Sequence, residues 1–280
     1  MTHVSEFIYG VMPDKLDKLK MAPKVTKNRL DAEVVKRGLV STTKKAKAFI
    51  MAGEILVNEE VAYKADTLVT ADHHIKIKEK YPYASRGASK IEKAFKEFSI
   101  DVKGKKVVDI GISTGGFTDY MLQKGAETAA GVDVNIDQVD DKLKQNKNLK
   151  LTEANARNLK KEDIGFEPDL ITMDVSFISV TKILPALSVF KNARIVTLIK
   201  PQFEIKKEKV EKGGIIREKE KRIEILMELK KKIQRLNYAV TGFTPAGVKG
   251  RKGNQEYFFL LEYGKKESIN DKIVTHAIGI

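Results

Sequence analysis

The second half of the chain alternates short apolar runs with amphipathic stretches. The apolar runs predict β-strands at Lys106–Ile110, Ala129–Val134, Asp169–Asp174, Arg194–Lys200, Ala239–Phe243 and Tyr257–Glu262. The stretches between them predict helices over residues 116–124, 137–145, 179–190 and 217–236. Near-continuous apolar strands are typical of parallel strands that are buried on both faces. The pattern therefore predicts a doubly wound α/β domain with a mostly parallel sheet, whose ligands bind beyond the carboxyl ends of the strands.

A smaller region with a different pattern comes before this domain. Apolar residues at helical spacing predict a helix that begins near Leu30, and Ser41 is expected to cap a second helix that ends at Gly53. Alternating residues predict short strands at 55–58 and 75–78. Together these elements predict a small α+β unit.

The two regions suggest how the chain is divided. Tyr81–Ala84 interrupts the pattern between them, and an amphipathic helix is predicted over residues 85–98. The expected boundaries are a poorly ordered extension at 1–21, the α+β domain at 22–80, a linker at 81–84, the α/β domain at 85–264 and a C-terminal tail at 265–280.

The net charge of the chain indicates which class of molecule it binds. The chain has 52 Lys and Arg against 38 Asp and Glu, a net charge of +14. A surplus of this size favours a polyanionic partner, which is nucleic acid more often than an anionic membrane surface. General solubility is the alternative explanation, and charge alone does not decide between them.

Other classes are excluded by what the sequence lacks. Without cysteine the chain has no disulfide, no thiolate zinc site and no cysteine nucleophile. No apolar run approaches the roughly 18–20 residues that span a bilayer, and Glu6 interrupts the apolar part of an N-terminal signal. We therefore expect a cytoplasmic protein without a membrane span.

Basic residues collect on the polar face of the small unit. They could contact the phosphates of folded RNA, or could simply form a solvated helix face. The residues expected to contact RNA are Arg29, Lys36, Arg37, Lys44, Lys45 and Lys47, together with Arg86 after the linker.

A turn of small residues follows the first strand of the large domain. The strand ends around Asp109, and Gly111, Gly115 and Gly116 lead into a helix. Small residues let the backbone approach a ligand closely. The spacing does not match the dinucleotide fingerprint, and the turn has no P-loop lysine. It matches the D-x-G-x-x-x-G-G pattern of S-adenosylmethionine sites.

An acidic residue supports this interpretation. Asp133 ends the next strand, where a carboxylate can accept hydrogen bonds from both ribose hydroxyls of the cofactor. The residues expected to line the cofactor are Asp109, Gly111, Ser113, Thr114, Gly115, Gly116, Phe117, Thr118, Asp133, Val134, Asn155, Ala156 and Asp174.

Four charged residues form the second candidate set: Lys90, Asp174, Lys200 and Glu256. Asp174 and Lys200 each end a predicted strand, and Glu256 begins the last one. Methylation of a ribose hydroxyl removes a proton from a very weak acid. A lysine can assist when a second cation lowers its pKa and carboxylates orient it. Taken singly, a helix lysine is usually solvated and a strand-end acid is often an ion-pair partner.

Several blocks of sequence resemble known families. The region from Arg29 to Asn58 resembles the S-four-type RNA-binding domain, although Glu59 stands where that domain commonly has Gly. The larger domain resembles the TlyA family, whose members are described as haemolysin A or as ribosomal RNA 2′-O-ribose methyltransferases. The blocks that carry this resemblance are Ser85–Lys90, Asp109–Asp119, Asp174–Ser179, Lys200–Glu204, Lys212–Gly214 and Gly253–Phe258.

The resemblance implies a function and a fold. It implies 2′-O-methylation of cytidines in ribosomal RNA of one or both ribosomal subunits, with S-adenosylmethionine as cofactor and no metal. It also implies an FtsJ-like fold, similar to the heat-shock RNA methyltransferases, and assigns Lys90, Asp174, Lys200 and Glu256 as the catalytic tetrad. Which lysine is the base stays open. The alternatives are a membrane-lytic haemolysin and a non-catalytic RNA-binding assembly factor.

Overall fold

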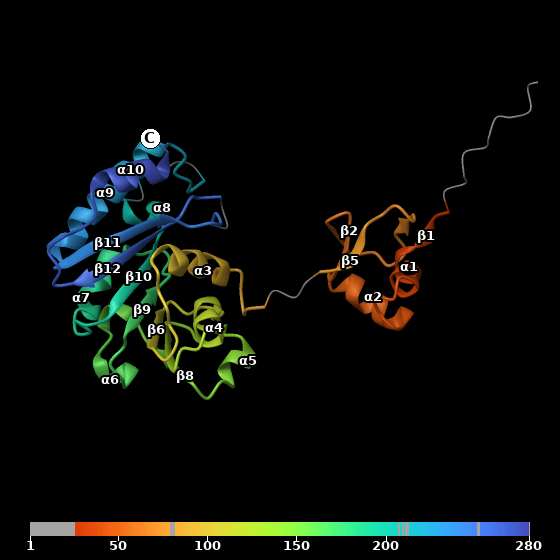
Figure 1. Cartoon of the computed structure of the whole chain (residues 1–280), viewed down its shortest axis with the longest axis horizontal. Coiled ribbons are helices and arrows are strands. Elements are labelled where there is room, and N and C mark those ends of the chain that lie inside the picture. Colours follow the sequence, from red (N-terminus) through yellow and green to blue (C-terminus); the bar gives the residue numbers. More distant parts are fainter. Residues whose placement is uncertain are drawn as a thin grey trace, which may run out of the picture. The chain divides into compact units, whose positions relative to one another are not determined.

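A computed structural model describes residues 26–78, 82–206, 208, 210, 213–250 and 253–279. The chain divides into two compact units, Met1–Lys80 and Tyr81–Ile280 (Figure 1). The expectation of a poorly ordered extension at 1–21 concerns residues outside the described ranges, as does Tyr81 of the expected linker.

The first unit packs two helices against short strands. Its elements are β1 (Asn28–Arg29), α1 (Leu30–Lys36), α2 (Thr43–Met51), β2 (Ile55–Val57), β3 (Glu60–Ala62), β4 (Leu68–Val69) and β5 (Ile75–Ile77). β2 pairs antiparallel with both β3 and β5, and β1 pairs with β4. The core consists of apolar side chains such as Leu30, Val34, Ile50 and Ile55. A small α+β unit results, as the periodicity predicts.

Two local features of this unit differ from the simplest sequence interpretation. Thr42, not Ser41, caps α2, because the Thr42 hydroxyl accepts a hydrogen bond from the Lys45 backbone N at 3.2 Å. The β2–β3 turn is formed by Asn58 and Glu59, both with left-handed φ, +49° and +68°. A left-handed turn residue explains why glycine is common at the position of Glu59.

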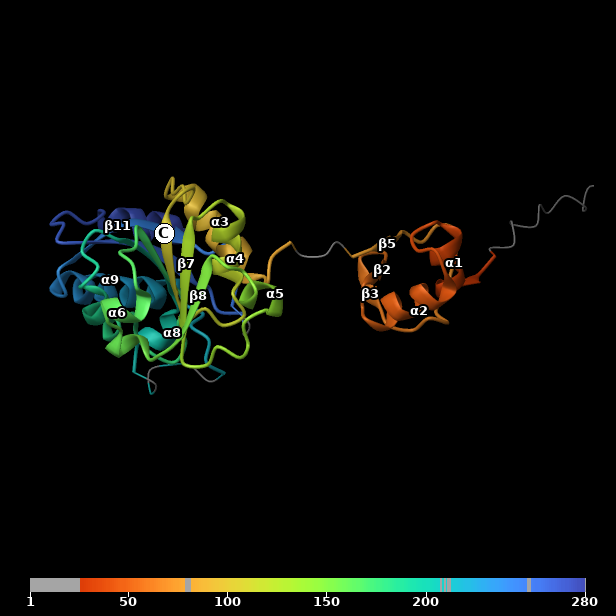
Figure 2. The same cartoon turned by 90° about the horizontal axis from the view of Figure 1, so that it is seen from below.

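The second unit is built on a seven-stranded sheet (Figures 1 and 2). Its strands are β6 (Lys106–Ile110), β7 (Thr128–Asp133), β8 (Leu149–Glu153), β9 (Leu170–Met173), β10 (Arg194–Ile199), β11 (Tyr238–Pro245) and β12 (Tyr257–Tyr263). The order across the sheet is β11-β12-β10-β9-β6-β7-β8. β12 runs antiparallel to both of its neighbours, and the other pairings are parallel.

Helices cover both faces of this sheet. They are α3 (Gly87–Glu97), α4 (Gly116–Gln123), α5 (Asp141–Lys144), α6 (Lys161–Ile164), α7 (Leu184–Leu187), α8 (Pro201–Glu204), α9 (Lys219–Arg235) and α10 (Asp271–Ile278), with 3-10 turns at Ala156–Asn158 and Val180–Lys182. Alternate residues of β6 face opposite layers: Val107 packs with α3 and α4, whereas Val108 packs with α6, α7 and α9. Burial on both faces is the reason why the central strands read as continuous apolar runs.

Some elements differ from the sequence prediction. β8 was not predicted, because it is an edge strand in which Lys150 and Thr152 interrupt the apolar pattern. The helix predicted over 179–190 is a 3-10 turn followed by the short α7, and that over 137–145 is reduced to α5. The segment treated as a C-terminal tail contains α10, which packs on α9 and β11.

The topology places a crevice beside β6. From β6 the chain moves outward to β7 and β8, and then returns to β9 on the opposite side of β6. Ligands of doubly wound sheets bind where the strand order reverses, outside the carboxyl ends of the strands. The turns that follow β6 and β9 therefore form the expected binding edge.

Candidate active site

The turn after β6 can be built only with glycine at its critical positions. Gly111 has a φ of +81°, and a Cβ placed there would lie 2.4 Å from the backbone oxygen of Asp174. Gly115 has a φ of +94°, and its Cβ would lie 2.2 Å from Leu143 Cδ2. The first clash is with backbone, which cannot swing aside as a side chain can. The turns after β6 and β9 are therefore in direct contact.

The Asp109 side chain fixes the start of α4, which follows this turn, through hydrogen bonds. It is buried, and Oδ2 accepts hydrogen bonds from the Thr118 backbone N at 3.1 Å and the Thr118 hydroxyl at 2.7 Å. The Thr172 hydroxyl donates to Oδ1 at 2.9 Å. Burial raises the pKa of the Asp109 carboxyl to about 6. Three of the residues expected to line the cofactor, Asp109, Phe117 and Thr118, have buried side chains.

Asp133 lies at the carboxyl end of β7, next to the same turn. Its Oδ2 accepts a hydrogen bond from the Ser113 backbone N at 3.0 Å, and Oδ1 accepts one from Asn135 N at 3.2 Å. The next side chain, Val134, is 67% exposed. Asn155 and the partly buried Ala156 follow β8, whose last residue pairs with Asp133. The edge thus combines an acidic group, an exposed apolar group and the glycine turn.

The four charged residues form two ion pairs. Lys90 Nζ on α3 lies 2.6 Å from Glu256 Oε2, and Lys200 Nζ lies 2.6 Å from Asp174 Oδ1. All four side chains are largely buried, and that of Asp174 is the most exposed of them. Removing a charge from water is costly unless the charge is paired. The close contact within each pair therefore offsets part of the cost of burying its two charges.

Strand register brings the two pairs to one edge of the sheet. In the antiparallel β10–β12 ladder, Ile199 is opposite Tyr257. Lys200 follows Ile199 and Glu256 precedes Tyr257, so both stand just beyond the same end of this ladder. Asp174 comes directly after β9, the parallel neighbour of β10. The structure therefore brings the predicted tetrad to the edge where the glycine turn lies.

Further residues beside Lys200 were missed by sequence reasoning. Lys200 Nζ donates a hydrogen bond to Ser176 Oγ at 2.8 Å. Phe177 has a φ of +65° and is 89% exposed, and its ring centroid lies 4.9 Å from that of Phe203. The Phe177 ring therefore lies open to solvent beside Lys200. The signal available in the sequence was the apolar Phe177 in a loop that follows a predicted strand.

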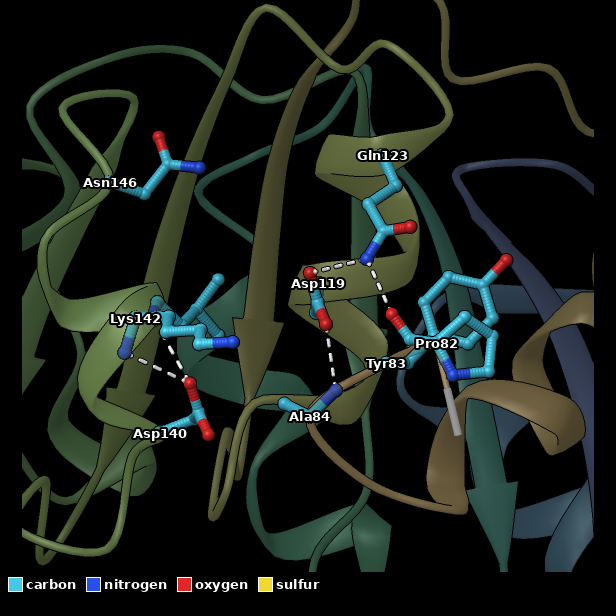
Figure 3. A pocket seen from close by; sticks show the side chains of 9 residues that line it. Pro82, Tyr83, Ala84, Asp119, Gln123, Asp140, Lys142 and Asn146 are labelled. Carbon is cyan, nitrogen blue, oxygen red and sulfur yellow. Dashed lines mark hydrogen bonds between the residues drawn. The ribbon is translucent and has the colours of Figure 1, made fainter. Parts of the chain in front are cut away.

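A pocket lies between Pro82–Ala84, α4 and α5 (Figure 3), next to the glycine turn, because Leu143 of its lining contacts Gly115. Ala84 N donates to Asp119 Oδ2 at 2.7 Å, and Gln123 Nε2 donates to the Pro82 carbonyl at 2.9 Å. Asp140, on the opposite wall, caps α5. The described part of the expected linker is thus fastened to the α/β unit.

The basic residues of the first unit fall into two groups. Lys36, Lys44, Lys45 and Lys47 are exposed, as is Arg86 at the start of α3. Arg37 is held inside its unit instead: its guanidinium donates to Glu33 Oε1 at 2.9 Å and to the carbonyl oxygens of Thr70, Ala71 and His73. Arg29 is exposed but forms two hydrogen bonds with Asp31. We therefore assign Arg37 a structural role rather than an RNA contact.

Comparison with known proteins follows the division of the chain. The model of the FtsJ-like methyltransferase family matches residues 83–263, and that of the S4 domain matches residues 28–75. Hemolysin A of Brachyspira hyodysenteriae is 41% identical over 236 residues, which are 82% of this chain and 97% of that protein. The chain belongs to the TlyA/hemolysin A family of FtsJ-like methyltransferases.

Other members of the TlyA/hemolysin A family extend the comparison. The 16S/23S rRNA (cytidine-2′-O)-methyltransferase TlyA of Mycobacterium tuberculosis is 34% identical over 255 residues, 89% of this chain and 95% of that one. A solved structure of a candidate hemolysin from Streptococcus thermophilus superposes with a TM-score of 0.69 at 32% identity, covering 90% of this chain and 94% of that one. The family's FtsJ-like domain and S4 domain are therefore both present here.

The described residues lack two features. Within them, no helix combines the length and apolarity that crossing a bilayer requires. They also contain no group of three or more His, Asp or Glu side chains arranged to hold a metal ion.

Proposed function

We propose that this chain transfers a methyl group from S-adenosylmethionine to the ribose 2′-hydroxyl of cytidine in ribosomal RNA. The observation that carries the proposal is the convergence of two lysine–carboxylate pairs on the sheet edge that holds the glycine turn. The name of the Mycobacterium tuberculosis relative, a 16S/23S rRNA (cytidine-2′-O)-methyltransferase, supports the choice of cytidine and of ribosomal RNA.

The residues present fit the proposed cofactor. Glycine at 111 and 115 lets the turn after β6 pack tightly against Asp174 and Leu143, and the Asp133 carboxylate beside this turn would accept hydrogen bonds from ribose hydroxyls. The exposed Val134 offers an apolar surface to an adenine ring. The residues that would line the site are Gly111, Ser113, Thr114, Gly115, Gly116, Asp133, Val134, Asn155, Ala156 and Asp174. When bound, the cofactor supplies an electrophilic methyl group and its own leaving group.

The tetrad would act on the ribose hydroxyl. An ammonium group has three N–H donors; Lys200 donates one to Ser176 Oγ, and its Nζ forms an ion pair with Asp174 Oδ1. We assign the remaining direction to the ribose oxygen: the Lys200 ammonium group would donate to that oxygen and stabilise its negative charge as the hydroxyl proton passes to solvent and the oxygen attacks the methyl carbon. The pair Lys90–Glu256 places a second cation and a second carboxylate nearby. A 2′-hydroxyl acceptor would also make the enzyme selective for RNA over DNA.

RNA binding would involve both units. The exposed lysines of α1 and α2 in the S4 domain suit phosphate contacts. In the methyltransferase unit, the exposed ring of Phe177 beside Lys200 suits stacking on a base that has been turned out of its helix.

Methyl incorporation tests the proposal directly. Purified full-length protein is incubated with labelled S-adenosylmethionine and separate small or large ribosomal subunits, and 2′-O-methyl positions are mapped on the recovered RNA. We expect label at a cytidine ribose, and we expect Lys200→Ala to lose at least about a hundredfold in rate while cofactor affinity is retained. Absence of incorporation into either subunit, or full activity of Lys200→Ala, would contradict the proposal.

A further inference from the structure

Two segments enclose the Lys200 ammonium group. One is the β9 loop, residues 174–179, and the other is the Lys200 segment, residues 200–204. They are joined at successive points along their length. These contacts are Lys200 Nζ–Asp174 Oδ1 at 2.6 Å, Lys200 Nζ–Ser176 Oγ at 2.8 Å, the Phe203–Phe177 ring pair with centroids at 4.9 Å, and Ser179 Oγ–Glu204 Oε2 at 2.5 Å.

The last of these contacts is made by a carboxyl group outside the tetrad. Glu204 Oε2 accepts a hydrogen bond from the Ser179 hydroxyl, and Oε1 accepts one from the Val180 backbone N at 3.1 Å. Burial raises the pKa of the Glu204 carboxyl to about 7, although the hydrogen bonds from Ser179 and Val180 and the positive charge of Lys232 oppose this shift. Both oxygens of the Glu204 carboxyl group thus accept hydrogen bonds from Ser179 and Val180, despite the cost of desolvating this group. Glu204 therefore joins its own segment to the segment that follows β9.

The β9 loop needs such a fastening. Phe177 takes a left-handed backbone conformation, which is unfavourable for a bulky residue and persists only where the surroundings hold it. Ser176 and Phe177 are both exposed, so core packing does not fix them. Ser179 stands at the far end of the loop, where its side chain caps the 3-10 turn Val180–Lys182. Glu204 therefore holds the loop at the end opposite Asp174.

We propose that Glu204 is a positioning residue of the methyl-transfer site, which fixes the β9 loop so that Ser176 orients the Lys200 ammonium group. Lys200 and Glu204 are four residues apart at the two ends of α8. One short helix thus presents the lysine and also anchors the loop that orients it. The inference rests on the proposed function in that Lys200 is taken as the group that acts on the ribose hydroxyl.

The test compares variants that remove or keep the anchor. Glu204→Ala removes both acceptors, whereas Glu204→Gln retains an acceptor for Val180 N and an amide that can bond Ser179. We expect Glu204→Ala to lower kcat by about tenfold without changing KM for S-adenosylmethionine, because small displacements of an oriented group are costly. Glu204→Gln should recover most of the rate. Ser179→Ala should lower kcat in the same direction, and its effect should not add to that of Glu204→Ala.

The matched control is Tyr238→Phe, which removes a buried hydrogen bond to the Leu184 carbonyl from a different part of the fold. It should lower Tm and leave kcat unchanged. A wild-type kcat in Glu204→Ala, or an equal loss of kcat in Tyr238→Phe, would overturn the proposal. Additive effects of Glu204→Ala and Ser179→Ala would also overturn it.

A second readout does not depend on activity. Hydrogen–deuterium exchange of the peptide that covers residues 174–180 should be faster in Glu204→Ala than in wild type, and Glu204→Gln should restore protection. If the wild-type protein did not methylate RNA, the proposed function would be refuted. The exchange measurement would still show whether Glu204 fixes the β9 loop. Unchanged exchange in Glu204→Ala would refute the positioning role.

Discussion

Lys90 and Glu256 are 166 residues apart in the chain, yet Lys90 Nζ donates a hydrogen bond to Glu256 Oε2 at 2.6 Å. Their side chains are only 16% and 5% exposed. Pairing at this depth rarely adds net stability over an apolar pair, but losing one partner leaves a buried charge without compensation. The presence of the Lys90–Glu256 pair is therefore weak evidence for a role in stability.

Removing one charge of the Lys90–Glu256 pair, and then both charges, distinguishes a role in methyl transfer from a role in stability. Glu256→Gln is expected to lower the free energy of unfolding by about 3 kcal/mol, because it leaves the buried charge of Lys90 without a counter-charge. The double variant Lys90→Met with Glu256→Gln should recover most of that loss but remain at least about tenfold slower in methyl transfer. Urea denaturation and methyl incorporation measure the two effects. An active double variant would exclude the pair from the mechanism.

The turn after β6 should not tolerate a side chain at Gly111. Gly111→Ala would place a Cβ 2.4 Å from the Asp174 backbone oxygen, so the two turns must separate. We expect affinity for S-adenosylmethionine to fall at least about tenfold, measured by calorimetry. Gly104→Ala is the control, because Gly104 also has a positive φ, +67°, but has open space around its Cβ position. Equal losses of affinity in both variants would argue against close approach at this turn.

Buried carboxyl groups should make stability fall as pH rises. The pKa of Glu204 is raised to about 7, so between about pH 4.5 and 7 the unfolded chain has lost this proton while the folded protein keeps it. The unfolded state binds fewer protons there, and the free energy of unfolding decreases toward higher pH, by at most about 3 kcal/mol from this group. Asp109, with a pKa raised to about 6, acts in the same direction.

Comparison of wild type with Glu204→Gln isolates that effect. Denaturation series between pH 4 and 8 should show that the stability of the variant, relative to wild type, increases through this window. A constant difference across the window would mean that the Glu204 carboxyl titrates alike in the folded and unfolded states.

Arg37 and the exposed lysines of α2 should respond differently to mutation. Arg37→Ala removes a partner of the buried Glu33 and is expected to destabilise the S4 domain by about 2 kcal/mol. Lys44→Ala with Lys45→Ala should leave stability unchanged, weaken RNA binding and reduce its salt dependence. Thermal melts and filter binding at several salt concentrations separate the two outcomes. A stable Arg37→Ala protein with weakened RNA binding would restore Arg37 as an RNA contact.

Phe177 should matter for RNA and not for folding. Its side chain is 89% exposed, so Phe177→Ala removes little buried surface and should leave Tm within a few degrees of wild type. Loss of a stacking partner for an extruded base should lower kcat/KM for ribosomal RNA by about tenfold or more, whereas Phe177→Tyr should be nearly neutral. Wild-type kcat/KM in Phe177→Ala would show that this ring faces solvent throughout the reaction.

Local patterns in the sequence determined much of the fold and part of the site. Continuous apolar runs predicted the central strands, because those strands are buried on both faces. The spacing of Gly111, Gly115 and Gly116 predicted a tight turn after β6, in which Gly111 and Gly115 have left-handed φ and a side chain at any of the three positions would clash. β8 was missed because an edge strand is half solvated, so its apolar pattern is broken.

Only the tertiary structure decided which residues act together. The register of β10 with β12 and the order of the sheet bring Lys200, Asp174 and Glu256 to one edge, and no local spacing encodes that meeting. Hydrogen bonds between segments likewise tie Asp109 to Thr118 at the start of α4 and Glu204 to Ser179 of the β9 loop. The physical reason is that desolvation and long-range pairing depend on what the rest of the chain places around a residue, whereas backbone propensity depends on its neighbours in sequence.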